Sequence, residues 1–239
     1  MKKRFYVSLL AFLLLTKLVA AQSLIQFVNP FIGTGGHGHT YPGATVPFGM
    51  VQLSPDNGTS GWDWCSGYNY SDTVIAGFSH THLSGTGIGD LCDISMMPVF
   101  NKKADTINAV YAFSHTNEKA SPGFYTVKLN NGISVKITAS KHTGIQQYQY
   151  PENVQQQIKL DLGWAINWDA TKETNLNKVN DSTFTGYRFS TGWAKKQKVY
   201  FVIQFSKKVI RLDTLRYKSG QGMTALFQFN NKQTIVEIN

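Results

Sequence analysis

Cysteine is scarce in this chain of 239 residues, which contains only Cys65 and Cys92. Two cysteines exclude a small scaffold held together by several disulfides, and no Cys-x-x-Cys pair is present for a structural zinc site. In an oxidising compartment the two cysteines would be able to pair if the geometry allowed, and two free buried thiols are the alternative. The sequence leaves this choice open.

Glutamate is missing before Glu118, the first in the chain, whereas residues 30–98 contain five aspartates. The chain also lacks the Gly-x-Ser-x-Gly of a nucleophile elbow and the Gly-Lys-Ser/Thr of a phosphate-binding loop. The segment HLSGTGIGD at residues 82–90 has a Gly-x-Gly-x-Gly spacing that does not match the dinucleotide fingerprint. It predicts instead a tight turn in which the backbone approaches a ligand closely.

A long hydrophobic run is also missing at the N-terminus, although a short one is present. Basic residues 2–4 precede an apolar run at residues 5–15, and small residues follow at 19–21. This order predicts a secretory signal peptide over residues 1–21, so we expect a soluble mature protein that is secreted or periplasmic. An uncleaved membrane helix is the alternative, although the run is short and Lys17 interrupts its end.

Charge is not concentrated anywhere in the mature chain. The whole sequence carries a formal net charge of +9, and removal of residues 1–21 with their four basic residues lowers it to +5. The remaining lysines and arginines are scattered, mostly beyond residue 100, without the clustered basic stripe that phosphate recognition requires. The sequence therefore predicts no nucleic-acid partner.

Beyond residue 100 the sequence alternates with period two, and no long amphipathic helix competes with this pattern. Strands are expected within 123–130, 132–140, 143–151, 155–162, 182–190, 197–206, 224–230 and 233–239. Asn130-Asn131-Gly132 predicts a hairpin between the first two, with a tight primed turn, because Asn-Gly accepts positive φ. Strands that recur about every ten residues are typical of a sandwich, so we predict an all-β, antiparallel β-sandwich over residues 22–239.

The last strand candidate ends one residue before the chain does. A strand that runs to the terminus without a polar tail suggests that the natural product continues beyond Asn239. A domain that ends on its last strand is the alternative.

Glycine, histidine, tryptophan and aspartate gather within residues 35–68. Trp62 and Trp64 are two residues apart, so in an extended segment they would share one face, with Asp63 turned away or reaching past them. Aromatic faces beside carboxylate and amide groups suit a sugar, whose C–H faces are apolar and whose hydroxyls need hydrogen-bond partners. The alternative is that both tryptophans fill a seam in the core.

The histidines of this region occur as two pairs, each at strand spacing. His37 and His39 form one pair and His80 and His82 the other. Neutral imidazoles so placed are able to ligate zinc, and the third ligand of a catalytic site would then have to come from one of four aspartates, Asp56, Asp63, Asp90 or Asp93. The sequence favours histidines that hydrogen-bond to hydroxyls in a polar pocket, and leaves any metal site unassigned.

Four segments stand in a specific order: VNPFIGTGGHGHTYPGATVPFGMVQLSPD, GWDWCSGYNYSD, GFSHTHLSGTGIGDLCDISMMP and EKASPGFYTVKL. Together they resemble the N-terminal domain of glycoside hydrolase family 92, the calcium-dependent exo-acting α-mannosidases. The resemblance is dense from Val28 to about Leu129 and extends to the end of the chain in strand pattern only. It implies an N-terminal β-sandwich followed by an (α/α)6 barrel, with the active site in the cleft between them.

The resemblance also implies an inverting mechanism, in which a glutamic acid protonates the leaving oxygen and a carboxylate base activates water, with calcium helping to distort the mannose. Both catalytic carboxyl groups belong to the barrel in that family, so we expect no catalytic residue and no calcium in this chain alone. The glycine-rich loops would then form one wall of a shared sugar pocket. The candidate substrate-binding residues are His37, His39, Trp62, Asp63, Trp64, His80, His82, Ser84 and Asp90.

Three functions follow as hypotheses. The chain is expected to be the substrate-binding part of a secreted exo-α-mannosidase that trims mannose-containing N-glycans, with α-1,2 linkages as the expected target, and to be inactive without its barrel. A free-standing carbohydrate-binding module is the second hypothesis, and a fragment without function is the third.

Overall fold

The computed structural model describes residues 24–103, 109–217, 221–230 and 235–238. The predicted signal peptide lies outside these ranges. Within them the regular elements are β-strands and two short 3-10 helices, η2 (Leu24–Phe27) and η3 (Trp62–Trp64). No helix of the described part is long and apolar enough to cross a bilayer.

The main regular elements are antiparallel strands, which begin within the glycine-rich half and continue to the end of the described part. They are β1 (Ala44–Thr45), β2 (Gln52–Asp56), β3 (Val74–Ile75), β4 (Gly77–Ser79), β5 (Ser95–Phe100), β6 (Tyr111–Ser121), β7 (Phe124–Leu129), β8 (Ser134–Ala139), β9 (Gly144–Gln149), β10 (Gln156–Asp161), β11 (Ala170–Lys178), β12 (Thr183–Thr191), β13 (Gln197–Gln204), β14 (Val209–Arg216), β15 (Met223–Phe229) and β16 (Ile235–Ile238).

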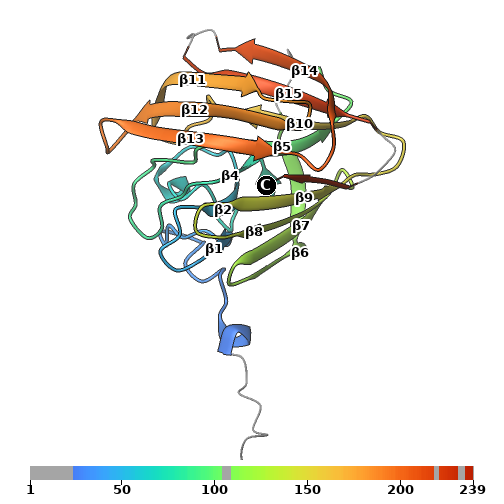
Figure 1. Cartoon of the computed structure of the whole chain (residues 1–239). Coiled ribbons are helices and arrows are strands. Elements are labelled where there is room, and N and C mark those ends of the chain that lie inside the picture. The colour runs from blue at the N-terminus through green and yellow to red at the C-terminus, as the bar shows by residue number, and fades with distance from the viewer. Residues whose placement is uncertain (1–23, 104–108, 218–220, 231–234, 239) are drawn as a thin grey trace, which may run out of the picture.

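These strands form three sheets. A seven-stranded sheet has the order β1-β2-β4-β5-β10-β15-β14, a six-stranded sheet the order β16-β9-β8-β7-β6-β3, and a three-stranded sheet the order β11-β12-β13. Figure 1 shows β11 to β13 across the top of the molecule and β6 to β9 at the bottom. The predicted all-β antiparallel sandwich is confirmed, with a small third sheet added to it.

The seven-stranded sheet is covered on both faces. All six residues of β10 are buried, and so are the neighbours Met96 and Met97 of β5, although successive side chains point to opposite faces of a sheet. Phe227 of β15 meets Phe184 of β12 at a ring-centroid distance of 4.9 Å, so the three-stranded sheet packs against one face. Strands β1 and β2 contact β8 of the six-stranded sheet. The two packings share one continuous apolar core.

All eight strands expected beyond residue 100 are confirmed, and they correspond to β7–β10, β12, β13, β15 and β16. Three long strands escaped prediction: β6, β11 and β14. Strands β11 and β14 lie at sheet edges, and β6 pairs along most of its length with β7 alone. Because edge strands are largely solvated, polar residues interrupt their alternation and the period-two signal is lost.

The hairpin between β7 and β8 is confirmed, but its turn is not the tight primed turn that the sequence suggested. Gly132 takes a positive φ of 91°, whereas Asn130 and Asn131 do not. The Gly132 N–H donates to the Leu129 carbonyl at 2.9 Å, and the Leu129 N–H donates to that of Ile133 at 2.8 Å. The loop therefore has three residues and ends on a left-handed glycine, the next commonest hairpin solution.

Candidate functional site

Three glycine-rich loops are joined at one end of the molecule. The Gly85 N–H donates to the His39 carbonyl at 2.7 Å, which connects the loop of residues 83–89 with that of residues 35–40. The Trp62 indole N–H donates to the Gly87 carbonyl at 3.1 Å, which connects the same loop with η3. Side chains of all three loops are therefore held in fixed relative positions.

The segment from Trp62 to Trp64 is a 3-10 helix, so the prediction that the two tryptophans share a face of an extended segment is wrong. With 3.0 residues per turn, side chains two residues apart point roughly 120° apart. Trp62 is 55% exposed, whereas Trp64 is half-buried and its indole N–H donates to Asp72 at 2.8 Å. The two tryptophans therefore have different surroundings, and neither belongs to the buried core.

The helix η3 begins at a glycine clamped by a distant residue. Gly61 has a φ of 139°, which favours glycine, and its N–H and carbonyl both bond to the Asn167 side chain, at 3.2 and 2.9 Å. Asn167 lies 106 residues away in the sequence. No local signal marks Asn167 or Asp72 as supports of this loop.

Trp62, Asp63, His37 and His39 form what we call the Trp62 cluster. His37 Nδ1 lies 2.5 Å from Asp63 Oδ1, and His39 Nε2 lies 3.8 Å from the same oxygen. The His39 ring meets Trp62 edge-on at a centroid distance of 4.3 Å. His39 is buried, and its Nε2 has no hydrogen-bond partner among the described residues.

The Trp62 cluster combines the groups that a sugar requires. Trp62 offers an exposed aromatic face, and Asp63 offers a carboxylate that accepts hydrogen bonds from hydroxyls. The imidazole of His37 is largely exposed, with a side-chain exposure of 73%. The unpartnered nitrogen of His39 leaves one further polar atom beside the indole. Four of the candidate residues are therefore brought together here.

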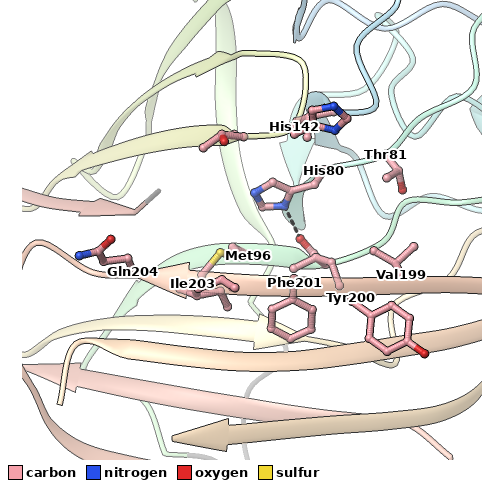
Figure 2. A pocket seen from close by; sticks show the side chains of 14 residues that line it. His80, Thr81, Met96, His142, Val199, Tyr200, Phe201, Ile203 and Gln204 are labelled. Carbon is pink, nitrogen blue, oxygen red and sulfur yellow. Dashed lines mark hydrogen bonds between the residues drawn. The ribbon is translucent and has the colours of Figure 1, made fainter. Parts of the chain in front are cut away.

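His80 and His82 do not join the Trp62 cluster by any contact that the structure shows. Both follow the end of β4, and His80 lines a cavity of about 370 Å³ together with His142 and residues 199–204 of β13. Figure 2 shows His80 and His142 on the side of this cavity opposite the β13 residues. His142 was not predicted, because a single histidine in a polar turn carries no sequence signal.

His80 is held as a neutral imidazole. Its Nδ1 donates to the Ile94 carbonyl at 2.7 Å, drawn as a dashed line in Figure 2, and its Nε2 faces the Gln146 amide at 3.3 Å. Burial lowers the pKa of His80, and the contact with the Ile94 carbonyl opposes this only in part. Both ring nitrogens of His80 contact other groups of the protein. His80 therefore lines the cavity without a free nitrogen for a ligand.

His82 is buried among polar groups of the protein that differ from those around His80. Its Nδ1 lies 2.7 Å from the Gln52 carbonyl, and its Nε2 lies 3.0 Å from Asp56 Oδ1 and 3.1 Å from Ser79 Oγ. Cys92 completes this buried surrounding, since its Sγ and the Asp56 and His82 ligand atoms all lie within 4.8 Å of one another. Because its nitrogens contact buried groups of the protein, we expect His82 to have a structural role and not to contact a sugar.

Ser84 and Asp90, the last two candidates, differ in their surroundings. Ser84 is exposed in the loop that carries Gly85 and Gly87. Asp90 is buried, and its Oδ2 accepts from the Trp193 N–H at 3.1 Å and from the Gln197 amide at 2.7 Å. Asp90 therefore connects its own loop to the turn between β12 and β13. It also lines, with Trp193, another cavity of about 340 Å³.

Cys65 and Cys92 are both buried and free, so of the two possibilities left open by the sequence the structure has free thiols. Burial raises the pKa of each thiol.

Within the described ranges, Asp56, His82 and Cys92 are the one group of three candidate metal ligands. Nitrogen and sulfur donors do not suit calcium, which takes six to eight oxygen ligands. The donor atoms of this group therefore do not fit calcium.

An antiparallel sandwich that carries an exposed tryptophan with polar neighbours on glycine-rich loops has the features of a carbohydrate-binding domain. The chain belongs to the Glycosyl hydrolase family 92 N-terminal domain family, whose sequence model matches residues 27–239. The resemblance read from the sequence is thereby confirmed.

A curated relative is 31% identical over 164 residues, which is 62% of this chain and 20% of the relative. It is described as an uncharacterized secreted glycosidase from Arthroderma benhamiae. The chain thus spans about a fifth of that protein.

Among solved structures, the family GH92 α-mannosidase BT3965 from Bacteroides thetaiotaomicron, in complex with mannoimidazole, is 34% identical to this chain with a TM-score of 0.82. The match covers 91% of this chain and 32% of that protein. The family GH92 inverting mannosidase BT2199 from the same organism is 24% identical with a TM-score of 0.73, over 91% of this chain and 31% of its own. The second likeness shows the fold alone.

Proposed function

We propose that this chain forms the substrate-binding part of a secreted exo-acting α-mannosidase and that the Trp62 cluster contacts the sugar. The observation that carries the proposal is the exposed Trp62, which stands beside Asp63, His37 and His39 on three interlocked loops. The likeness to an α-mannosidase solved with mannoimidazole supports mannose as the sugar. The secreted glycosidase among its relatives supports export.

The finer features of this proposal come from the family resemblance. They are inversion at the anomeric carbon, action on mannose-containing N-glycans with α-1,2 linkages, and calcium in the intact enzyme. Inversion requires two carboxyl groups about 6.5–9.5 Å apart. Asp63, the one carboxylate of the Trp62 cluster, is held by His37 at 2.5 Å. The proposal assigns both catalytic carboxyls and the calcium to the barrel and sugar recognition to this chain.

Apolar side chains near the start of the described chain support a partner domain. Leu24, Ile25, Phe27, Ile32 and Phe48 are each more than half exposed. Exposed apolar area beyond a few hundred Å² on a monomer marks an interaction surface. We propose that an (α/α)6 barrel covers such surface, so the chain alone is expected to self-associate. A monodisperse, thermally robust monomer in sedimentation experiments would favour the free-standing module instead.

The proposal predicts that the chain alone does not hydrolyse α-mannosides above the buffer rate, with or without calcium. Saturable, calcium-stimulated release of mannose by the chain would contradict it and would assign catalysis to aspartates of this domain. Mannoside affinity without hydrolysis, measured by calorimetry, would favour a carbohydrate-binding module.

The decisive experiment compares the two tryptophans in an enzyme rebuilt with a family barrel. Trp62→Ala should leave the melting temperature nearly unchanged and reduce kcat/KM at least tenfold, which is about 1.4 kcal/mol of transition-state binding. Trp64→Ala is the matched control. It should lower the melting temperature, because loss of a packed tryptophan and of its bond to Asp72 costs about 3 kcal/mol. Normal kcat/KM in folded Trp62→Ala would refute the role of the Trp62 cluster.

A further inference from the structure

Asp56, His82 and Cys92 meet in the interior although they come from different segments. Asp56 ends β2, whereas His82 and Cys92 lie in the connection between β4 and β5. Their relative exposures are 0%, 4% and 0%, and their ligand atoms all lie within 4.8 Å of one another. The sugar proposal does not use this group.

The hydrogen bonds of His82 determine which of its nitrogens faces the group. Nδ1 lies 2.7 Å from the Gln52 carbonyl, which only accepts, so Nδ1 carries a proton. In a neutral imidazole Nε2 is then an acceptor, and it lies 3.0 Å from the carboxylate oxygen Asp56 Oδ1. Two acceptors at this distance repel each other unless a proton or a metal cation lies between them. A shared proton or a bound metal cation would turn this contact into an attractive one.

The space beside the pair is kept free of side-chain atoms by a glycine. A Cβ on Gly67 would lie 2.3 Å from Asp56 Oδ1 and 3.0 Å from His82 Nε2. Gly67 also has a φ of 84°, which favours glycine. The second carboxylate oxygen, Asp56 Oδ2, is buried and has no hydrogen-bond partner among the described residues. A buried acceptor left unpaired is costly, so it points to a ligand.

Cys92 is held toward this group in an unfavourable backbone conformation. Its φ is 59°, in the left-handed region, at a cost of about 1–3 kcal/mol for a residue with a Cβ. Burial raises the pKa of the Cys92 thiol, and the neighbouring carboxylate Asp56 adds to this effect. A metal bound here would take the Cys92 thiolate and release the thiol proton.

We propose that Asp56, His82 and Cys92 bind a zinc ion. Carboxylate oxygen, imidazole nitrogen and thiolate sulfur are the ligand types of zinc in proteins. Ordinary Zn–ligand bonds place tetrahedral ligand atoms roughly 3.3–3.6 Å apart, so movements of about 1 Å would close the present group around the ion. The bond from His82 Nδ1 to a backbone carbonyl is the support that metal-binding histidines usually have.

The zinc ion has a structural role in this proposal. It fastens the connection between β4 and β5, which contains the loop of residues 83–89, to the end of β2. Because that loop bonds to His39 and to Trp62, the ion stabilises the support of the Trp62 cluster without touching a ligand there. The fourth coordination position is left for water or for Ser79 Oγ, which lies 3.1 Å from His82 Nε2.

The test uses the full chain, stripped of metal by a chelator and then titrated with zinc or with cobalt(II). We expect one equivalent of either metal to bind, and cobalt to give the near-ultraviolet charge-transfer band of a thiolate ligand. Zinc should raise the melting temperature of the stripped protein. Cys65→Ser is the matched control, because it removes the other buried cysteine and should retain the band and the stabilisation.

Cys92→Ser should lose the charge-transfer band and weaken zinc binding at least tenfold. If the cation is only a proton on His82, the wild-type chain will bind no stoichiometric zinc, and that result overturns the proposal. A cobalt band that persists in Cys92→Ser and disappears in Cys65→Ser overturns it too. If Cys92→Ser does not fold, the wild-type titration and the variant His82→Gln decide, since the proposal requires His82→Gln to weaken zinc binding at least tenfold.

Discussion

The glycine-rich loops of residues 33–94 and the strands beyond residue 110 are built on different principles. The strands carry apolar side chains that alternate with polar ones, and hydrogen bonds between neighbouring strands satisfy the backbone. The loops contain residues with positive φ that are not glycine, among them His39 and Cys92, and depend on side-chain bonds to distant residues. The comparison teaches that the strands follow a local side-chain pattern, whereas the loop conformations depend on contacts with residues distant in the sequence.

Arg188 is the strongest link between the two regions. It lies on β12, is fully buried, and donates to Asp93 in the loops at 2.5 Å as well as to Asp169 and the Trp164 carbonyl. Desolvation by burial tends to lower its pKa, but the two carboxylates outweigh this and raise it. Removal of one member of such a buried network is costly, because it leaves the other charges unpaired in the interior.

Of the changes considered, loss of Arg188 should lower the free energy of unfolding most. Arg188→Met leaves Asp93 and Asp169 buried without their cation, which costs about 3–5 kcal/mol of unfolding free energy. Arg211→Met removes an exposed partner of Asp213 and should cost about 0.5 kcal/mol. Urea denaturation measures both values. Equal costs in the two variants would show that Arg188 does not join the regions.

A methyl group should cost more at Gly186 in a strand than at Gly85 in a loop, because the two glycines differ in the space around them. Gly186 of β12 has no room, because a Cβ would meet the Asn175 carbonyl at 2.2 Å and Phe201 at 2.5 Å, so Gly186→Ala should cost about 3 kcal/mol. At Gly85 no atom lies within 4 Å of the added Cβ, and only its φ of 70° opposes the change. We therefore expect Gly85→Ala to cost about 1 kcal/mol. The reverse order of the two melting temperatures would contradict this difference between the regions.

The smallest effect concerns a buried tyrosine of the strand region. Tyr150 donates to the Gln157 carbonyl at 2.6 Å, and burial raises its pKa well above the ordinary value. Tyr150→Phe should cost about 1 kcal/mol at neutral pH. Above about pH 10 an unfolded tyrosine ionises while the folded one does not, so wild-type stability falls with rising pH. The cost of Tyr150→Phe should then shrink, and a cost independent of pH would show that Tyr150 is not protected from ionisation.

Much of the fold could be predicted from the sequence. The eight strands with clear alternation, the hairpin at Gly132 and the sandwich class all follow from side-chain period and turn chemistry, which act over a few residues. Strands β11 and β14 could not be predicted, because they lie at solvated sheet edges that tolerate polar residues on both faces, and β6 was missed because it is paired mostly on one side. The existence of the third sheet was likewise invisible, since alternation does not reveal which strands become neighbours.

The candidate site was predictable in part. The sequence directed the site hypothesis to the glycine-rich loops, and the structure brings four of the residues named there, Trp62, Asp63, His37 and His39, together. It also placed Trp64 on the same face as Trp62, because an extended segment was assumed where the chain forms a 3-10 helix. That helix depends on the Gly61 bonds to Asn167, a partner 106 residues away. Long-range contacts of this kind leave no trace in a local pattern.

The sequence by itself determined eight of the strands, the export signal as a prediction, and the resemblance to family 92, because each depends on a pattern in contiguous residues. Only the tertiary structure decided which residues meet. It exposed Trp62 more than Trp64, left Cys65 and Cys92 unpaired, and set the ligand atoms of Asp56, His82 and Cys92 within 4.8 Å of one another. The physical reason is that residues with positive φ, buried charges and clustered metal-ligand side chains each raise the free energy of the folded state. They persist only where contacts with many other parts of the fold hold them in place.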